Sequence, residues 1–432
     1  MVIDRRKLTD PDGNAIYAIA AVALSLYVFA YSVRLGQISI LAFYAVWFLP
    51  VALAPRILLR NPAPILVLSL LPVAFLLSTA WSDVPSVTLR SAIQYATTIF
   101  CGIVAARMVS VPNLALGGTL GGLAVLVYSA MNGSYSYDYV DGSYAFQGAF
   151  ASKNQLGYFA TLTMIFALGL LAIYRTHFVL WPLAVGAMGM AVWLLLKSDS
   201  ATSLLSAGAA FAAIFMVRGL FALERGLRFS AICLLLSATA GAALAAFRAG
   251  VFDAVLAAFG KDSTLTGRTY LWNQAIEIGA RNPTFGLGYN AFWTHGRPEA
   301  EQLWEEFFIT GRTGFHFHNL LIESYVALGI LGLILVGGIC VLLVAMPITA
   351  ILQRRGTGSV MICSGLSLLF LVRSGAEVDF ITAYTAGSFL VSFVIVHLFD
   401  HVHIRTKTAG WRGAQAGTSD LSGLFSKTTA AR

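Results

Sequence analysis

Long apolar runs are the feature that most constrains the fold of this chain. A run of about 17 to 20 residues is enough to cross a hydrocarbon layer ~30 Å thick as an α-helix. Of the 432 residues, 58% are hydrophobic and only 11% are charged, far outside the range of a soluble globular protein. The sequence predicts an all-α, polytopic integral membrane protein with about twelve transmembrane helices, near residues 15–33, 37–55, 63–81, 92–108, 112–131, 156–174, 178–196, 201–217, 229–247, 318–346, 359–376 and 380–399.

The placement of lysine and arginine predicts the orientation of these helices. With the N-terminus in the cytoplasm, the cytoplasmic segments hold 17 of the 28 basic residues but six of the 20 acidic ones. We expect a cytoplasmic N-terminus over residues 1–14, a transmembrane domain over 15–399 whose first span is a retained signal anchor, and a disordered cytoplasmic tail over 400–432. The net charge of +8 is then a topology signal and does not indicate nucleic-acid binding.

Two predicted outer connections are long, residues 132–155 and the larger loop 248–317. Long ordered loops often carry function. In the larger loop, TGRTYLWNQAIEIGARNP predicts a short helix capped by Thr266, and PEAEQLWEEFFI predicts a second, with the glycine-rich turn FGLGYN between them. Both helices are amphipathic and are expected to lie on the outer membrane surface as a cover.

The stretch FHFHNLLIESYVALGILGL, residues 315–333, places two histidines and an asparagine directly against an apolar run. Here a helix N-terminus would face the outer compartment, and its dipole would keep His318 neutral, the form a general base needs. Asn319 and Glu323 stand four residues apart, so a hydrogen bond between them could fix the start of the helix. The alternative is that His316 and His318 are simply interfacial residues at a helix end, and the stretch alone leaves both readings open.

Basic side chains at other outer helix ends suggest a bound anion. Arg90 precedes the fourth predicted span, Lys153 opens the sixth and Arg268 opens the loop helix. A cation at a helix N-terminus opposes the dipole, and the planar fork of arginine suits a pyrophosphate. For any one of them, snorkelling to the membrane surface is the simpler explanation. Further candidates are Arg281, Arg312 and Arg373.

No cofactor or metal is predicted. The four cysteines fall inside predicted spans, and there is no HExxH motif, P-loop or paired aspartate motif in the outer loops. Two groups of residues are weaker candidates for a metal site, and for both the alternative is that they are ordinary surface side chains. They are the histidines near the inner end of the last span (His397, His401 and His403) and the acidic face of the second loop helix (Glu299, Glu301, Glu305 and Glu306).

Several blocks of the sequence resemble one family in the same order. They are WSDVPSVTLRSA at 81–92, GAFASKNQLGYFA at 148–160, SDSATSLLSAG at 198–208, GRTYLWNQAIEIGARNPTFGLGYNAF at 267–292, and His318-Asn319 followed by Gly329-Ile330-Leu331-Gly332. Over roughly residues 65–340 the chain resembles the O-antigen ligase and polymerase superfamily of bacterial inner membranes. Within this superfamily, SKNQLG and SATS are more similar to the exopolysaccharide polymerases of the ExoQ type than to the lipid A core ligases.

The resemblance implies a helical glycosyltransferase of the GT-C kind, with a periplasmic active site beneath the large loop and a glycan donor on undecaprenyl pyrophosphate. It places the catalytic histidine at His318 and the pyrophosphate-binding arginine at Arg268. Arg90 and Lys153 fall in blocks where the family has basic residues, although many members have no lysine at the position of Lys153. Asn319 and Glu323 would orient the base, and Trp272, Tyr289, Trp293 and Trp304 could line a sugar path.

The family reading leaves the acceptor open. A polymerase would transfer the growing chain to a new lipid-linked repeat with inversion, and would work beside a flippase and a chain-length regulator. A ligase would use the same chemistry on lipid A core or a protein. A third alternative, a twelve-helix transporter or flippase, predicts internal repeats and ionisable groups near the midplane.

Overall fold

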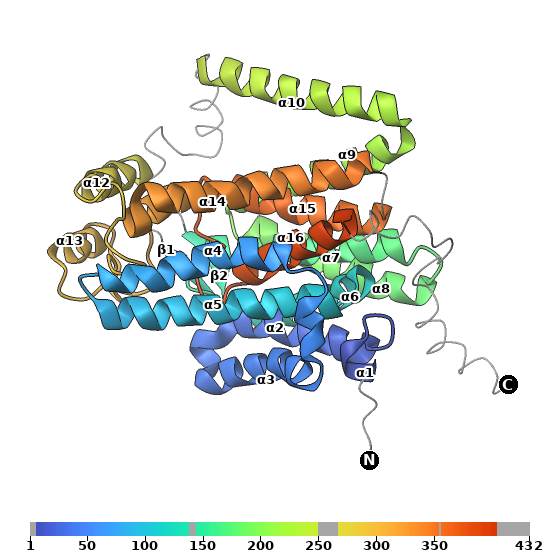
Figure 1. The fold of residues 1–432 in the computed structure, drawn as a ribbon, viewed down its shortest axis with the longest axis horizontal. Helices are drawn as coiled ribbons and strands as arrows, with labels where there is room; N and C mark the ends of the chain where they lie inside the picture. The colour runs from blue at the N-terminus through green and yellow to red at the C-terminus, as the bar shows by residue number, and fades with distance from the viewer. Residues whose placement is uncertain (1–5, 138–143, 249–266, 354–355, 404–432) are drawn as a thin grey trace.

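The computed structural model of the chain describes residues 6–137, 144–248, 267–353 and 356–403, and these are almost entirely helical (Figure 1). The helices are α1 (Arg6–Thr9), α2 (Ala15–Leu35), α3 (Gln37–Leu53), α4 (Ala63–Leu77), α5 (Pro85–Met108), α6 (Val111–Met131), α7 (Lys153–Ile173), α8 (Trp181–Lys197), α9 (Ala201–Ala222), α10 (Arg225–Arg248), α12 (Arg268–Ala280), α13 (Pro298–Glu306), α14 (Leu320–Leu352), α15 (Thr357–Ser374) and α16 (Ala386–His403). One antiparallel hairpin joins β1 (Ser134–Tyr137) to β2 (Tyr144–Gly148).

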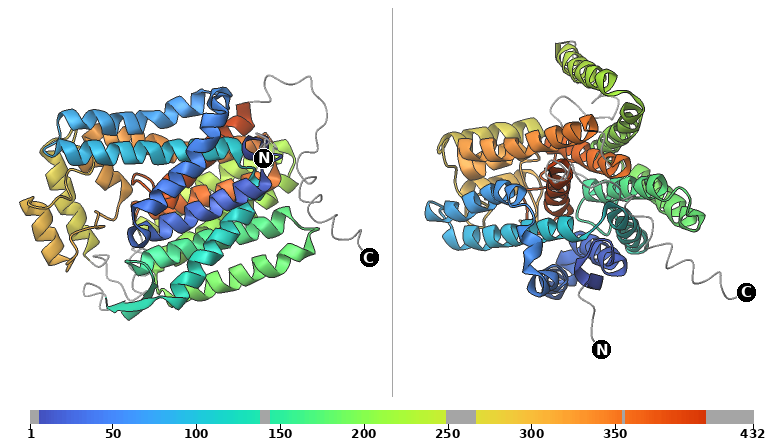
Figure 2. Two further views of the ribbon diagram at one scale, coloured as in Figure 1. Left: turned by 90° about the horizontal axis from the view of Figure 1, so that it is seen from below. Right: turned by 45° about the vertical axis from the view of Figure 1, so that its right-hand side comes forward.

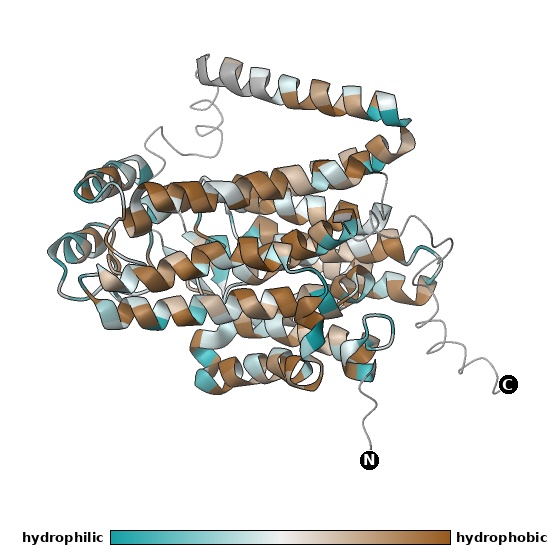
Figure 3. Cartoon of the chain, in the orientation of Figure 1, coloured by the Kyte–Doolittle hydropathy of each residue, from teal (hydrophilic) through white to brown (hydrophobic). Residues whose placement is uncertain are grey.

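Every predicted span coincides with a helix. Among the described residues, nine helical segments are long and apolar enough to cross a membrane, which confirms a polytopic all-α membrane protein. Of the three other predicted spans, two fall on the shorter apolar helices α3 and α16 and one on α10, so the count of twelve stays a prediction. The apolar residues run along the lengths of the helices and the polar residues gather at their ends (Figure 3).

The largest difference from a predicted boundary is at the start of α5. Helix α5 begins at Pro85, seven residues before the predicted start at 92. The reason is local, since proline at the first helical position has the right φ and gives up no hydrogen bond. The early start places Arg90 within the helix rather than before it.

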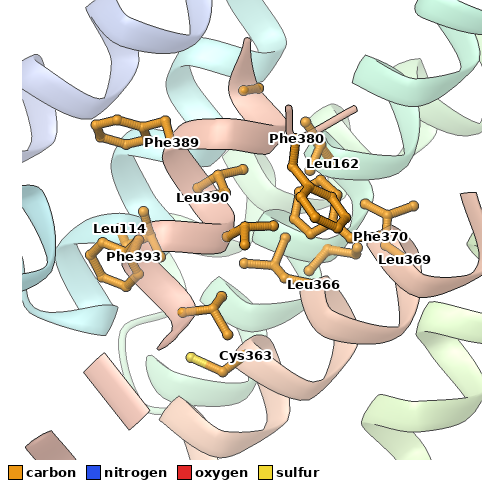
Figure 4. Packing of buried hydrophobic residues seen from close by; sticks show 14 of the residues in the cluster. Leu114, Leu162, Cys363, Leu366, Leu369, Phe370, Phe380, Phe389, Leu390 and Phe393 are labelled. Carbon is orange, nitrogen blue, oxygen red and sulfur yellow. The ribbon is translucent and has the colours of Figure 1, made fainter. Parts of the chain in front are cut away.

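The bundle is built around helices from both halves of the chain. Helix α6 packs between α2 and α7, α15 packs on α9, and α16 packs on α5. In the two further views of Figure 2, α16 lies inside the bundle with other helices around it. Phe389, Leu390 and Phe393 of α16 belong to the same buried cluster as Phe370 of α15 and Leu114 of α6 (Figure 4). This packing fixes the segment between α15 and α16, which contributes to the site described below.

Helix α10 departs from the bundle (Figure 1). It is anchored at its start by Arg228, whose buried guanidinium donates hydrogen bonds to the carbonyls of Leu220, Leu223 and Ile351. Carbonyl acceptors of this kind satisfy the donors of a buried cation.

Helices α12 and α13 lie together at one end of the bundle, here named the loop end (Figure 1). They bury a small core of their own, which contains Leu271, Leu303, Trp304 and Phe317. The first turn of α2 and the last turn of α5 meet at the opposite end, where Asn14 donates to the carbonyl of Met108. The two predicted loop helices therefore exist, and each buries an apolar face. The predicted Thr266 cap and most of the tail 400–432 lie outside the described residues.

A break in α14 attaches the loop to the bundle. Gly329 has φ 62° within the helix, so nearby backbone groups are released from the helical pattern. The loop segment after α12 satisfies them: Leu287 and Gly288 donate to the carbonyls of Val326 and Ala327, and Ile330 donates to the carbonyl of Pro283 at 2.7 Å. A Cβ on Gly329 would lie 2.5 Å from that carbonyl oxygen. The glycine-rich turn FGLGYN and the Gly329-Ile330-Leu331-Gly332 motif thus lie on the two sides of one contact.

Candidate active site

The loop core positions one wall of the site. Arg268 is the first residue of α12, after Gly267, which has a left-handed backbone and makes no side-chain cap. The indole of Trp272, one turn further on, donates to the carbonyl of Phe317 at 2.8 Å. This bond ties the start of α12 to the segment that carries the two histidines.

The start of α14 is held by side chains on both sides of it. Asn319 caps the helix by accepting from the amides of Leu321 and Ile322 at 3.0 and 3.1 Å. Glu323 accepts from the amide of Phe317 at 2.8 Å and from the indole of Trp293 at 3.2 Å. Asn319 and Glu323 are joined by a backbone hydrogen bond, in which the Glu323 amide donates to the Asn319 carbonyl at 2.9 Å. Their side chains bind other groups, so a side-chain bond between the two is not formed. Both residues nevertheless fix the start of the helix.

His318 stands directly before this cap in a left-handed conformation, with φ 52°. Its amide donates to Nδ1 of His316 at 3.1 Å. A positive φ is uncommon for a residue with a side chain and persists only when the surroundings hold it. The two rings lie 4.3 Å apart between centroids and face the same carboxylate.

That carboxylate is Glu377, in the segment between α15 and α16. Arg268 lies 3.3 Å from its Oε1, His318 Nδ1 3.8 Å from the same oxygen, and His316 Nε2 3.7 Å from Oε2. Asn154, in the first turn of α7, donates to Oε1 at 2.7 Å. Glu377 is buried, and the structure leaves the inward-facing Nδ1 of His318 without a hydrogen-bond partner.

The charges within this cluster follow from burial and proximity. Burial acts to raise the pKa of Glu377, but its positively charged neighbours, including Arg373 and Arg268, outweigh burial and hold the pKa well below its usual range. Burial lowers the pKa of His316 to about 3, and Arg268 and Arg373 act in the same direction. Glu377 is therefore an anion and His316 is neutral at ordinary pH.

Arg373, a further candidate from the sequence, supports the cluster from behind. Its guanidinium binds Asp379 through two nitrogens, at 2.5 and 3.1 Å, and lies 4.4 Å from the centre of the Tyr158 ring. Such a paired contact fixes the backbone on both sides of Glu377. Because it is buried and already paired, Arg373 is a structural support in this arrangement.

The structure does not bring all the predicted residues together. Lys153 opens α7, next to Asn154, and so borders the cluster. Arg90 is exposed in the second turn of α5, where its charge acts on Tyr384 in the segment after Glu377. Arg281 is at the far end of α12 from Arg268 and pairs on the surface with Glu299 at 2.7 Å. Arg312 pairs with Glu301 at 2.6 Å. Neither of these last two arginines contacts Glu377.

The aromatic residues have structural roles in this arrangement. Tyr289 and Trp304 are buried, and Tyr289 stacks on Phe75 with ring centres 3.7 Å apart. A buried ring cannot line a sugar path, so that expectation fails for these two. Trp272 and Trp293 are half-buried and donate to Phe317 and Glu323.

Glu377 and Asn154 are not among the site residues predicted from the sequence. Glu377 falls in the short gap between two predicted spans, and an ionisable residue at such a position is costly unless it has partners. This cost is a signal in the sequence by which Glu377 could be predicted as a site residue. Asn154 has no comparable signal, because its role depends on a partner 223 positions away in the sequence.

Comparisons with known proteins show the family to which the chain belongs. The O-antigen ligase family matches residues 186–337, a range that contains α12, α13 and the two histidines. The exopolysaccharide production protein ExoQ of Rhizobium meliloti is 41% identical over 413 residues, which cover 95% of this chain and 94% of that protein.

The fold, the site and these matches define the class: a polytopic membrane glycosyltransferase of the polymerase or ligase type. The chain belongs to the O-antigen ligase and polymerase superfamily, and within it is similar to ExoQ along nearly its whole length. The predicted resemblance is confirmed, and membership gives no support to the transporter alternative.

Proposed function

We propose that the protein is a polymerase of lipid-linked oligosaccharide repeats, which moves a glycan from undecaprenyl pyrophosphate to a sugar hydroxyl with inversion and without a metal. The observation that carries the proposal is the meeting of His318 and Arg268 on one buried carboxylate, Glu377. A base and an anion-binding cation thereby lie side by side at the loop end.

His318 is the general base. The Glu377 carboxylate faces Nδ1, which favours the tautomer with its proton there and leaves the Nε2 lone pair free to accept a proton. A separation of 3.8 Å is longer than a hydrogen bond, and catalytic contacts of this kind often shorten only when substrate is bound. The left-handed backbone of His318 and the Asn319 cap hold the ring in place.

Arg268 is the anion clamp. It is 15% exposed and lies 3.3 Å from Glu377, so a pyrophosphate can compete for its guanidinium at modest cost. Lys153 and Arg90 are proposed as further contacts to the anion. Arg281 is not, because it lies at the far end of α12 and pairs with Glu299 on the surface. Arginine would stabilise the charge that develops on the leaving group.

The step is a single displacement. The acceptor hydroxyl oxygen forms a bond to the anomeric carbon of the donor while its proton passes to Nε2 of His318. The bond from that carbon to the pyrophosphate oxygen breaks, and undecaprenyl pyrophosphate leaves with the electron pair. Attack opposite the leaving group inverts the anomeric centre.

The acceptor distinguishes a polymerase from a ligase. The similarity to ExoQ along the whole chain favours a lipid-linked repeat as acceptor. Purified enzyme given one defined lipid-linked repeat should produce a ladder of longer lipid-linked glycans. If it extends nothing, yet transfers the repeat to lipid A core or to a protein, the enzyme is a ligase.

The proposed location is the bacterial inner membrane, with both termini in the cytoplasm and the site in the periplasm. In a chain whose Cys233 is replaced by serine, Thr310→Cys beside α13 should react with an impermeant thiol reagent in spheroplasts. Thr357→Cys at the start of α15 should not. Both positions are exposed. The reverse labelling pattern would overturn the orientation.

A further inference from the structure

We propose that His316, His318 and Glu377 form a binding site for a divalent transition metal of the zinc class, and that the metal inhibits the enzyme. One ring nitrogen of each histidine and one Glu377 oxygen all lie within 4.8 Å of one another. Two imidazoles and one carboxylate are a ligand set that suits zinc, copper or nickel.

The distances favour closure around an ion. Ligand bonds of about 2.0 to 2.1 Å in a tetrahedral site put neighbouring ligand atoms about 3.3 Å apart. The nitrogen to oxygen separations here are 3.7 Å from His316 to Oε2 and 3.8 Å from His318 to Oε1, so a shift of a few tenths of an ångström would suffice for each nitrogen and its own oxygen. The three residues come from two segments that packed elements already hold, which limits the ordering required.

The contacts already made set what binding would have to change. His316 accepts from the amide of His318 through Nδ1, so its neutral ring carries the proton on Nε2. Binding through Nε2 would move that proton to Nδ1 and break the bond from the His318 amide. Nδ1 of His318 is buried and has no hydrogen-bond partner. Two nearby arginines would repel a metal ion to different extents. The charge of Arg373 is neutralised by Asp379. Arg268 is 3.3 Å from Glu377 and would be displaced by the ion. A hard ion such as magnesium prefers oxygen ligands and gains little from two imidazoles.

Inhibition, unlike binding, rests on the proposed function. A neutral imidazole that binds a metal through Nδ1 carries its proton on Nε2. His318 would then present a donor where the reaction needs an acceptor, and Arg268 would lose its place beside Glu377. The reaction itself needs no metal, so excess EDTA alone should leave transfer unchanged.

Binding can be measured without any activity. Purified full-length protein in detergent should take up one equivalent of zinc in competition with a chromophoric chelator, and magnesium should not compete. His316→Gln and Glu377→Gln should each weaken that binding at least about tenfold, since even outer-shell partners of metal sites contribute that much. His295→Gln, in the same loop, is the matched control and should bind as the parent does. Measuring both cluster variants guards against one of them misfolding.

The other histidine group gives the competing explanation. If His397→Gln with His401→Gln abolishes the zinc equivalent while both cluster variants retain it, the proposed site is wrong. If the cluster binds zinc as predicted but zinc leaves transfer unchanged, then the role of His318 as base fails while the metal site stands. Zinc inhibition that EDTA reverses, and that His295→Gln retains, is the expected result.

Discussion

Two groups of charged and histidine side chains lie at the two ends of the bundle, and they differ in how tightly they are paired. At the opposite end from the loop, Arg107 contacts Asp400 at 2.5 Å and the carbonyl of Asn61 at 2.6 Å, and Asn61 donates to Asp400 at 3.1 Å. His397 and His401 stack nearby, on the helix that carries Asp400. At the loop end, Arg268, His316 and His318 lie 3.3 to 3.8 Å from Glu377.

The difference separates a structural ion pair from a working site. The side chain of Arg107 is 1% exposed and its contacts with Asp400 and Asn61 are short, so a ligand could reach it only by breaking them. The loop-end side chains are 8 to 26% exposed, and their contacts with Glu377 are longer, at 3.3 to 3.8 Å. Longer contacts of this kind can be exchanged for contacts with a substrate at modest cost. We therefore expect substitutions at the loop end to reduce activity and substitutions at the other end to reduce stability.

The largest expected effect is on the base. His318→Ala should lower the transfer rate by about 10²- to 10⁴-fold, the usual contribution of a general base. Because position 318 has φ 52°, His318→Asn is the better second variant, since asparagine tolerates that backbone. Initial rates of polymer formation by purified protein provide the measurement. Long polymer from either well-folded variant would remove His318 from the mechanism.

Arg107→Ala should have the next largest effect, on stability rather than on chemistry. It leaves a partly buried carboxylate without its cation, which typically costs about 3–5 kcal/mol. Thermal unfolding in detergent should show the loss, while the transfer rate per folded molecule stays near that of the parent. A fully stable Arg107→Ala protein with a reduced rate would erase the distinction between the two ends.

Arg268→Ala should lower the transfer rate by about 10²- to 10³-fold, as loss of one oxyanion donor does. Arg268→Lys should recover part of the rate, because an ammonium keeps the charge but cannot form the paired fork. Unfolding temperature should fall less than in Arg107→Ala, since Glu377 keeps the hydrogen bond from Asn154. Equal rates for the lysine and alanine variants would argue against pyrophosphate binding by the guanidinium.

The smallest effect is expected at the other end of the same helix. Arg281 is 63% exposed and pairs with Glu299, and exposed pairs contribute about 0–1 kcal/mol. Arg281→Ala should therefore alter neither stability nor transfer noticeably, and it serves as the matched control for Arg268→Ala. A loss of transfer comparable to that of Arg268→Ala would restore Arg281 as a substrate-binding residue.

The helices could be predicted from the sequence because each depends on its own residues. An apolar run of sufficient length specifies its helix, and errors such as the start of α5 at Pro85 arise from local capping. The break in α14 could not be placed in this way. Gly329 departs from the helix because a loop segment about 40 residues earlier supplies the missing hydrogen bonds.

The site was predictable only in part for the same reason. His318 and Arg268 stand out because polar residues against apolar runs are costly, and the ordered family blocks singled them out. Glu377, which contacts both, lies in a short segment between two long apolar runs, where it does not stand out in the sequence. The pairing of Arg281 with Glu299 depends on how α12 and α13 pack, so sequence alone could not separate Arg281 from Arg268.

The central claim is that His318 moves a proton while Arg268 holds the anion, and donor binding tests it directly. Equilibrium binding of an undecaprenyl-pyrophosphate-linked repeat should be unchanged in His318→Ala and weakened about tenfold or more in Arg268→Ala, the effect of losing a charge-assisted hydrogen bond. The opposite result, with donor binding lost in His318→Ala and retained in Arg268→Ala, would contradict both assignments.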